Sequence, residues 1–303
     1  MTRLMLLDTA SLYFRAYYGV PESFTAADGT PVNAIRGLLD FVARLVVDHS
    51  PTRVVACWDD DWRPDFRVAA IPSYKAHRVA ADSLDGEAEE VPDTLAPQVP
   101  VIAELLGALG IPVIGAPGHE ADDVIGTLAT REAGPVDVVT GDRDLFQLVD
   151  DSRPVRILYT ARGVARAEVI DEAAVTAKYD IPGRSYAPFA ALRGDPSDGL
   201  PGVKGVGEKT AASLVRLHGD IAGVLAAARA GEGMSASVAA KVLAAQDYLA
   251  VAPRVVDVVR DLDLPEVDGS LAALPADPER VVELADRWNV ASAVNRVLVA
   301  AAR

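Results

Sequence analysis

The feature that most constrains the fold is a set of five short, predominantly apolar and β-branched runs in the first half of the chain. They are residues 4–7, 54–58, 111–114, 136–140 and 155–159. Such runs are typical of strands buried on both faces of a parallel sheet. Helix-like segments lie between them, including one that Asn33 is expected to cap and one that begins near Glu120. This alternation predicts an α/β fold with a mostly parallel sheet flanked by helices.

The chain changes character in its second half. From about residue 171 the strand-like runs thin out and Ala-rich helical patterns dominate. We therefore predict two domains, an α/β domain over 1–170 and an all-α domain over 171–303. Residues 79–97 are acidic and poor in large apolar side chains, which predicts an exposed insertion. The helical spacing of Val281 and Leu284 predicts that a late helix packs against the first domain.

Composition bears on location and partners. Cys57 is the only cysteine, so the chain cannot form an internal disulfide, and a reducing cytoplasm fits. No apolar stretch approaches the roughly 20 residues of a membrane helix, and the first apolar run ends at Asp8, too early for a secretory signal. We therefore expect a cytoplasmic protein without a membrane partner. The net charge of −15 argues against nucleic acid unless the acids gather in a metal site.

Acidic side chains do follow the ends of the predicted strands. The carboxyl ends of strands in an open parallel sheet are where ligands bind. Carboxylates crowded there would repel one another without cations, and Mg²⁺ and Mn²⁺ prefer oxygen ligands. The sequence therefore predicts a divalent metal site. The candidate ligands are Asp8, Asp59, Glu120, Asp122, Asp123, Asp142, Asp144, Asp195 and Asp198.

Each acid also has an ordinary structural interpretation. A single Asp after a strand usually forms a turn or caps a helix, and Glu120 and Asp122 suit the positive end of a helix dipole. Asp59 is followed by two further acids, so either Asp59 or Asp60 could be the ligand. The metal site is favoured because the pattern recurs at several strand ends.

A second signal is the segment GVKGVGEKTA at 202–211, which precedes an apolar helix. Its three glycines let the backbone turn tightly and approach a ligand, and the following helix presents unpaired N–H groups to a phosphate. Lys204 and Lys209 add positive charge. The pattern is typical of a helix-hairpin-helix, which grips a DNA backbone without reading sequence. A plain helix-turn-helix loop is the alternative, and the spacing excludes a Walker loop.

Taken together, these motifs resemble the bacterial 5′–3′ exonuclease and flap endonuclease family, which includes the N-terminal domain of DNA polymerase I. The resemblance extends to about residue 260. It rests on LDTASL at 7–12, WD at 58–59, YKAHR at 74–78, HEADD at 119–123, TGDRDL at 140–145, GDPSD at 194–198 and LPGVKGVGEKTA at 200–211. Gly199 departs from the family, which often has Asn there, and the acids of 82–90 enlarge the family's arch.

The resemblance implies a PIN-like domain, a helical arch at about 74–98 and a helix-hairpin-helix at about 195–218 within the all-α domain. It implies DNA as the partner, as 5′ flaps, nicked or gapped duplexes and 5′ ends, cut to leave 5′-phosphate and 3′-hydroxyl. With no polymerase domain in these 303 residues, a stand-alone enzyme of DNA replication and repair is expected.

Residue roles follow from the resemblance. We expect two Mg²⁺ or Mn²⁺ ions about 4 Å apart, the first held or ordered by six of the acids and the second by Asp144, Asp195 and Asp198. Lys75 and Arg78 are the expected catalytic cations, which neutralise charge on the phosphate. Tyr17, Tyr18 or Tyr74 could stack on an unpaired base. The expected DNA-binding residues are Tyr74, Gly202, Val203, Lys204, Gly205, Val206, Gly207, Lys209 and Thr210.

The resemblance also implies a K⁺ ion at the hairpin, which the glycines only permit. Two other functions stay open at this point. A PIN-like ribonuclease shares a carboxylate-lined parallel sheet but needs no glycine hairpin, and a non-catalytic, structure-specific DNA-binding protein needs no intact set of acids.

Overall fold

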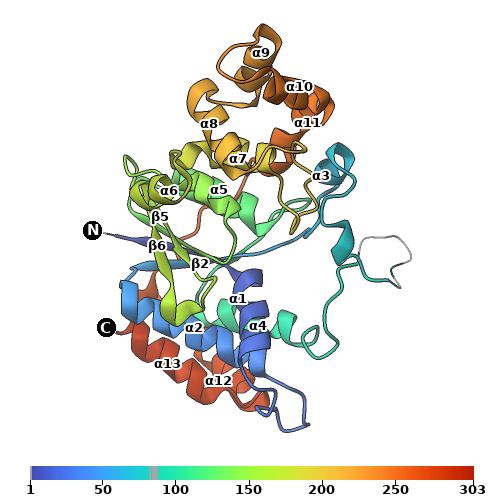
Figure 1. Cartoon of the computed structure of the whole chain (residues 1–303). Coiled ribbons are helices and arrows are strands. Elements are labelled where there is room, and N and C mark those ends of the chain that lie inside the picture. The colour runs from blue at the N-terminus through green and yellow to red at the C-terminus, as the bar shows by residue number, and fades with distance from the viewer. Residues whose placement is uncertain (1, 82, 84–87) are drawn as a thin grey trace.

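The structure is a computed structural model that describes residues 2–81, 83 and 88–303. Within these residues, six strands form one sheet in the order β3-β2-β1-β4-β5-β6. All neighbouring strands run parallel except β6, which is antiparallel to β5. The predicted α/β fold is confirmed (Figure 1). The strands are β1 (Leu4–Asp8), β2 (Arg53–Cys57), β3 (Val113–Ile114), β4 (Val136–Thr140), β5 (Val155–Tyr159) and β6 (Glu168–Ile170).

Successive residues of β1 alternate between two hydrophobic cores. Leu4 and Leu6 face a core that they share with α5 (Ala121–Arg131) and that continues into the helical domain. Met5 and Leu7 face a core that contains residues of α2 (Asn33–His49) and α4 (Gln98–Leu109). This alternation follows from the two-residue period of a strand. Because both faces are covered, β1 is an unbroken apolar run up to Asp8.

The helical domain stacks on the α5 side of the sheet and extends away from it (Figure 1). A continuous core joins it to the sheet, so it is anchored rather than loosely tethered. Its helices are α6 (Glu172–Tyr179), α7 (Tyr186–Arg193), α8 (Glu208–His218), α9 (Ile221–Ala230), α10 (Ala236–Ala244) and α11 (Gln246–Val256).

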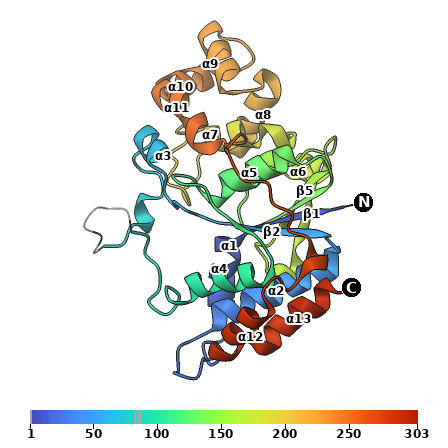
Figure 2. The ribbon, with the colours of Figure 1, turned by 180° about the vertical axis from the view of Figure 1, so that it is seen from behind.

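The segment 171–303, expected to form one domain, divides between two places. After α11 the chain runs back across the body, and α12 (Pro278–Arg287) and α13 (Ala291–Ala301) pack beneath the sheet against α4 and α2 (Figure 2). Val281 and Leu284 are buried in the same core as α2. The late helix therefore packs on the first domain, as its apolar spacing predicts.

Three local features differ from the expectations. Asn33 does not cap α2, because Val32 holds that position, and the buried Asn33 amide instead donates to the carbonyls of Tyr17 and Val20. Strand β3 is shorter than 111–114 because Pro112 has no N–H to add to the ladder. Strand β6 was not expected, because three residues at a sheet edge leave too weak a pattern.

The expected arch leaves the body between α3 (Asp65–Ala70) and α4 and stands to one side of the sheet (Figure 1). Its described part includes a single turn at Ala76–Arg78 and a bridge between Val79 and Glu89. The acids at 82, 85 and 87 lie outside the described residues. In the part of the chain that the structure describes, no single helix is long and apolar enough to cross a membrane. One bent pair, α8 with α9, meets that test by length and composition alone.

Candidate metal centre and nucleic-acid interface

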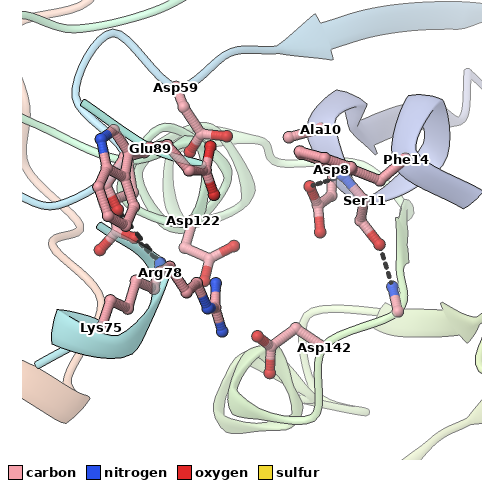
Figure 3. Close-up of a pocket in the computed structure, with 13 residues that line it drawn as sticks. Asp8, Ala10, Ser11, Phe14, Asp59, Lys75, Arg78, Glu89, Asp122 and Asp142 are labelled. Carbon is pink, nitrogen blue, oxygen red and sulfur yellow. Dashed lines mark hydrogen bonds and ion pairs between the residues drawn. The ribbon is translucent and has the colours of Figure 1, made fainter. Parts of the chain in front are cut away.

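The sheet topology brings the predicted acids to one edge. Strand β1 has β2 on one side and β4 on the other, so the order in which strands are added reverses there. Ligands bind in open sheets outside the carboxyl ends at such a reversal. A cavity of about 260 Å³ opens at this point (Figure 3). Its acidic lining residues are Asp8, Asp59, Glu89, Glu120, Asp122 and Asp142.

Asp8 and Asp142 are linked by one buried hydroxyl. Thr140 donates its hydroxyl to Asp8 Oδ2 at 2.6 Å and accepts the Asp142 N–H at 2.8 Å. Asp8 also caps α1 (Thr9–Gly19) by accepting the Ser11 N–H at 3.1 Å. Burial, the nearby Asp59 and Asp142 raise the pKa of Asp8 to about 7. Asp8 therefore caps a helix and lines the cavity with the same carboxylate.

Asp59 lies opposite Asp8 in the cavity (Figure 3). It accepts the Ala121 N–H at the start of α5 at 2.7 Å, and burial raises its pKa to about 6. Burial followed by repulsion from Asp142 and Asp8 raises the pKa of Asp122 well above its usual value. The cavity therefore holds more negative charge than its own hydrogen bonds compensate. Asp60 is absent from its lining, so the geometry favours Asp59 over Asp60 as the predicted ligand.

Glu120 is the one cavity acid surrounded by donors. Oε2 accepts from Arg67 at 2.8 Å and from the Tyr74 hydroxyl at 2.7 Å, while Oε1 is paired with Lys75. Tyr74 is 5% exposed, so its ring is not available for the base stacking that the sequence suggested. Its role here is to hold Glu120.

Asp123 is not brought to the cavity with the other acids. It is fully buried on the far side of α5, where Arg67 binds both carboxylate oxygens. Burial raises the pKa of Asp123, but the hydrogen bonds from Arg67 outweigh it and leave that pKa below its usual value. Among the nine candidate ligands, Asp123 is the one that a guanidinium already neutralises on both oxygens.

Asp144, Asp195 and Asp198 form a second group beside Asp142. Burial, then Asp142, Asp198 and Asp195, raise the pKa of Asp144 well above its usual value. Its Oδ1 is buried and has no hydrogen-bond partner among the described residues. Asp195 accepts from Arg193 at 3.1 Å, and Asp198 accepts from Arg78 at 3.0 Å. Burial raises the pKa of Asp198 to about 6.

Gly199 explains one departure from the family pattern. Its φ of 72° lies in the left-handed region, and a Cβ there would collide with the Ser73 carbonyl. The backbone of this loop is bonded to the base of the arch, since the Lys75 N–H donates to the Asp198 carbonyl at 3.0 Å. Glycine thus lets the second acidic group lie directly against Lys75.

The carboxylate oxygens of these two groups of acids are ligands that suit a hard cation. In residues 2–81, 83 and 88–303, no three His, Cys, Asp or Glu side chains have converged into a set that could hold a metal ion. The chemistry nevertheless fits Mg²⁺ or Mn²⁺, because the groups are carboxylates, burial and repulsion raise the pKa values of Asp122 and Asp144, and Asp144 keeps an unpartnered buried oxygen.

Lys75 and Arg78 project into the cavity from the base of the arch (Figure 3). The Arg78 guanidinium is tied to the Ser197 carbonyl at 2.7 Å. Phe14 and Trp62 also line the cavity, and the motifs in the sequence single out neither. A signal existed for Phe14, because the helix that Asp8 caps must bring its first turns to the site. Trp62 lies in an irregular loop and offered none.

The glycine segment forms the turn between α7 and α8. Gly202 and Gly205 have φ values of 63° and 77°, which glycine adopts without strain. Val203 and Val206 are buried, so their side chains anchor the turn rather than face a ligand. The exposed residues from Lys204 to Lys209 are Lys204, Gly205, Gly207, Glu208 and Lys209, and Thr210 is half-buried. Lys241 of α10, not singled out before, donates to the Gly205 carbonyl at 3.1 Å.

An acidic cavity at the sheet reversal, cations that project into it and a glycine hairpin in the helical domain together define a class of protein, the hydrolases that cleave phosphodiester bonds of nucleic acid. Within that class, the chain belongs to the 5′–3′ exonuclease family. Residues 3–180 match the family described as "5'-3' exonuclease, N-terminal resolvase-like domain", and residues 181–279 match "5'-3' exonuclease, C-terminal SAM fold". The resemblance seen in the motifs is confirmed, and so is the assignment as an enzyme.

Individual relatives agree. The chain is 58% identical to a 5′–3′ exonuclease of Streptomyces coelicolor over 97% of this chain and 98% of that protein. It is 52% identical to a 5′–3′ exonuclease of Mycobacterium tuberculosis over 97% and 96%. It is also 39% identical to DNA polymerase I of Mycobacterium bovis, over 93% of this chain and 30% of the polymerase.

Solved structures share the fold. A bacteriophage T5 flap endonuclease, in a pseudo-enzyme-product complex with DNA and metal ions, has a TM-score of 0.67 at 17% identity over 99% of this chain and 100% of that one. The T5 5′-exonuclease with bound zinc has a TM-score of 0.66 at 16% identity, over 99% of both chains.

Proposed function

We propose that this 5′–3′ exonuclease is a structure-specific enzyme that cuts DNA at 5′ flaps, nicks, gaps and 5′ ends with the help of divalent cations. The observation that carries the proposal is the cavity at the sheet reversal, where Asp8, Asp59, Asp122 and Asp142 come together and burial raises the pKa values of Asp8, Asp59 and Asp122. The fold shared with a T5 flap endonuclease bound to DNA and metal ions supports it.

The residues that would hold two Mg²⁺ or Mn²⁺ ions fall into two groups. Asp8, Asp59, Glu120, Asp122 and Asp142 surround the cavity, and Asp144, Asp195 and Asp198 lie beside Asp142. Bound divalent ions would supply a hydroxide-like nucleophile near neutral pH and neutralise charge at the leaving oxygen. Attack of water at the phosphorus with departure of the 3′-oxygen would break the P–O3′ bond and leave 5′-phosphate and 3′-hydroxyl ends.

The chain's own cations and rings would position the DNA. Lys75 and Arg78 are fixed by Glu120, Asp198 and the Ser197 carbonyl, so they meet a phosphate with little reorganisation. Phe14 and Trp62 provide apolar surface on the cavity wall against which a base could stack.

The hairpin would hold the duplex at a distance from the cut. Lys204, Lys209 and the exposed glycines lie at the start of α8, whose first N–H groups suit a phosphate. Backbone carbonyls of the same turn would hold K⁺ if the ion binds as the resemblance implies. Such contacts attach to the DNA backbone and carry no sequence preference.

Asp142→Asn tests the proposal. The change removes a cavity charge at nearly constant volume, and we expect cleavage of a 5′-flap DNA in Mg²⁺ to fall at least about a hundredfold while binding of the same DNA in EDTA is retained. Asp263→Asn, an exposed acid, is the matched control and should cleave normally.

The substrate panel should include single-stranded RNA. Full activity of Asp142→Asn would contradict the ligand assignment, and faster cleavage of the RNA than of the flap would favour a ribonuclease instead.

A further inference from the structure

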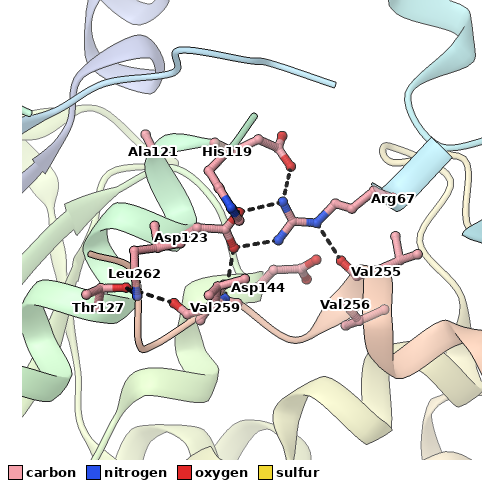
Figure 4. A network of polar contacts seen from close by, with 12 residues as sticks. Arg67, His119, Ala121, Asp123, Thr127, Asp144, Val255, Val256, Val259 and Leu262 are labelled. Atoms are coloured by element: carbon pink, nitrogen blue, oxygen red, sulfur yellow. Dashed lines mark hydrogen bonds and ion pairs between the residues drawn. The ribbon is translucent and has the colours of Figure 1, made fainter. Parts of the chain in front are cut away.

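Arg67 of α3 is a buried cation that connects three separate elements. It is 2% exposed. One of its terminal nitrogens donates to Glu120 and Asp123, each at 2.8 Å, and the other donates to Asp123 at 2.7 Å. Its Nε donates to the Val255 carbonyl at the end of α11 at 3.0 Å (Figure 4). The guanidinium therefore joins the base of the arch, the start of α5 and the last turn of the helical domain.

Both carboxylate oxygens of Asp123 are already occupied by protein groups, which leaves neither free to bind a metal ion. Oδ1 accepts from Arg67 and from the Val259 N–H at 2.9 Å, and Oδ2 accepts from Arg67 and lies 3.1 Å from His119 Nδ1. The neighbouring Asp122 instead lines the cavity. Adjacent residues on a helix point about 100° apart, so one acid can face the cavity while the next faces away from it.

The outer face of α5 continues this attachment. Asp123, Thr127 and Arg131 are spaced by four residues and form one stripe along the helix. Thr127 accepts the Leu262 N–H at 3.3 Å, and Arg131 donates to the Leu264 carbonyl at 3.0 Å. The stripe therefore binds the connector 255–264, which links α11 to the returning C-terminal helices.

Gln147 fixes the same connector from the other side. It donates to the Val256 carbonyl at 3.0 Å and accepts the Val258 N–H at 3.1 Å. The connector is thus held to the body by side chains along its length. The helix that carries Glu120 and Asp122 is held between the acidic cavity and this connector.

We propose that Arg67 and Asp123 form a positioning pair, which sets the start of α5, and with it Glu120, against the end of the helical domain. Asp123 holds no cation and acts through Arg67. Displacing the pair shifts Glu120 and Asp122 together, because both belong to the same first turn. The inference rests on the proposed function in taking the cavity acids as metal ligands.

Two adjacent substitutions test it. Asp123→Asn leaves a buried guanidinium without its charge partner, and we expect the thermal midpoint of the metal-free protein to fall by about 5–15 °C. Asp122→Asn removes one of several mutually repelling charges, and the midpoint should stay unchanged or rise. The comparison needs no activity measurement and no bound metal.

Cleavage of a 5′-flap DNA, assayed well below both midpoints, supplies the second measurement. Asp123→Asn should lower kcat by roughly tenfold and leave KM for DNA unchanged, and because it displaces metal ligands without removing one, it should raise the half-saturating Mn²⁺ concentration less than Asp122→Asn does. Asp122→Asn should raise that concentration by at least about tenfold. Arg67→Lys keeps the positive charge but lacks the two guanidinium nitrogens that donate to both oxygens of Asp123. Its kcat should exceed that of Arg67→Met, which has no charge.

An Asp123→Asn protein that needs as much extra Mn²⁺ as Asp122→Asn, with an unchanged midpoint, would overturn the inference. Equal kcat for Arg67→Lys and Arg67→Met would also count against it. If wild-type cleavage required no divalent cation, the proposed function would fail instead, while the contrast between the two midpoints would still test the pair.

Discussion

Charge compensation separates the acids of the site into two kinds. Glu120 and Asp123 are neutralised by Arg67 and Lys75, and Glu120 also accepts a hydrogen bond from the Tyr74 hydroxyl. Asp8, Asp59, Asp122 and Asp144 have raised pKa values instead. The first kind stabilises the metal-free protein, and the second kind destabilises it until a cation binds.

This difference predicts how stability depends on pH. Because the folded pKa values of Asp8 and Asp59, about 7 and about 6, exceed the usual 3.8, the folded protein binds more protons than the unfolded chain in between. Stability from these groups is present at low pH and lost as pH rises toward 7. We expect the thermal midpoint of the metal-free protein to rise as the pH is lowered from about 8 to about 6. Mg²⁺ should raise the midpoint more at about pH 8 than at about pH 6.

Differential scanning fluorimetry measures both effects, and Asp8→Asn should flatten the pH dependence. Asp123 acts in the opposite sense because its pKa is lowered, and its contribution disappears only as pH falls below the ordinary range of an Asp. A metal-free midpoint that rises between pH 6 and pH 8 would refute the assignment of these shifts.

The sequence could predict which acids gather, but not every orientation. Asp8, Asp59 and Asp142 follow strands that become parallel neighbours, so a shared edge was predictable. The orientation of Asp123 depends on Arg67, which lies 56 residues away in a short helix without a motif of its own. Pairing over such a distance has no local signal.

At the level of elements, the glycine hairpin combines a rigid interior with an exposed charged surface. Val203 and Val206 are buried, Gly202 packs against the backbone of Arg193 and Gly194, and the lysines project outward. The interior fixes the turn, so its charges are presented in one arrangement. Lys241 extends this surface, because its ammonium is bonded to the turn itself.

The hairpin lysines should therefore control the salt dependence of DNA binding. In Lys204→Ala, Lys209→Ala and Lys241→Ala, we expect weaker binding to all DNA sequences. The slope of log K against log salt should become shallower by about 0.9 for each DNA phosphate that the missing ammonium had neutralised. Arg44→Ala on α2, which lies at the opposite end of the molecule in Figure 1, is the control.

Fluorescence anisotropy titrations between low and moderate salt measure these slopes. An unchanged slope in all three lysine variants would remove the hairpin from the DNA interface. A reduced slope in Arg44→Ala would show instead that the effect is general to surface cations.

At the scale of the whole molecule, the C-terminal helices α12 and α13 pack on the α/β domain, against α4 and α2. Helices α12 and α13 bury apolar residues against α2 and α4, although more than 200 residues separate α2 from α13 in sequence. The apolar spacing of α12 predicted that this helix is buried. The predicted domain boundary at residue 170 did not include the return of the chain to the α/β domain after α11. Matches to the two family regions end at 180 and 279 and leave α13 outside.

This packing predicts a stabilising role far from the chemistry. Leu284 is 1% exposed, so Leu284→Ala should reduce the free energy of unfolding by about 2–5 kcal/mol. Val282 in the same helix is 60% exposed, and Val282→Ala should change it little. Urea denaturation measures both. Cleavage rates of the two proteins should match at low temperature, and a selective loss in Leu284→Ala would show that α12 influences the active site.

The path of the chain gives the helical domain two covalent tethers, one entering near residue 171 and one leaving through 255–264. A single protease nick in either tether would leave both fragments associated. The domain interrupts the body in sequence, so α12 and α13 are synthesised only after the domain is complete. On the ribosome, the surfaces of α2 and α4 that α12 and α13 cover must therefore stay exposed until those helices have emerged.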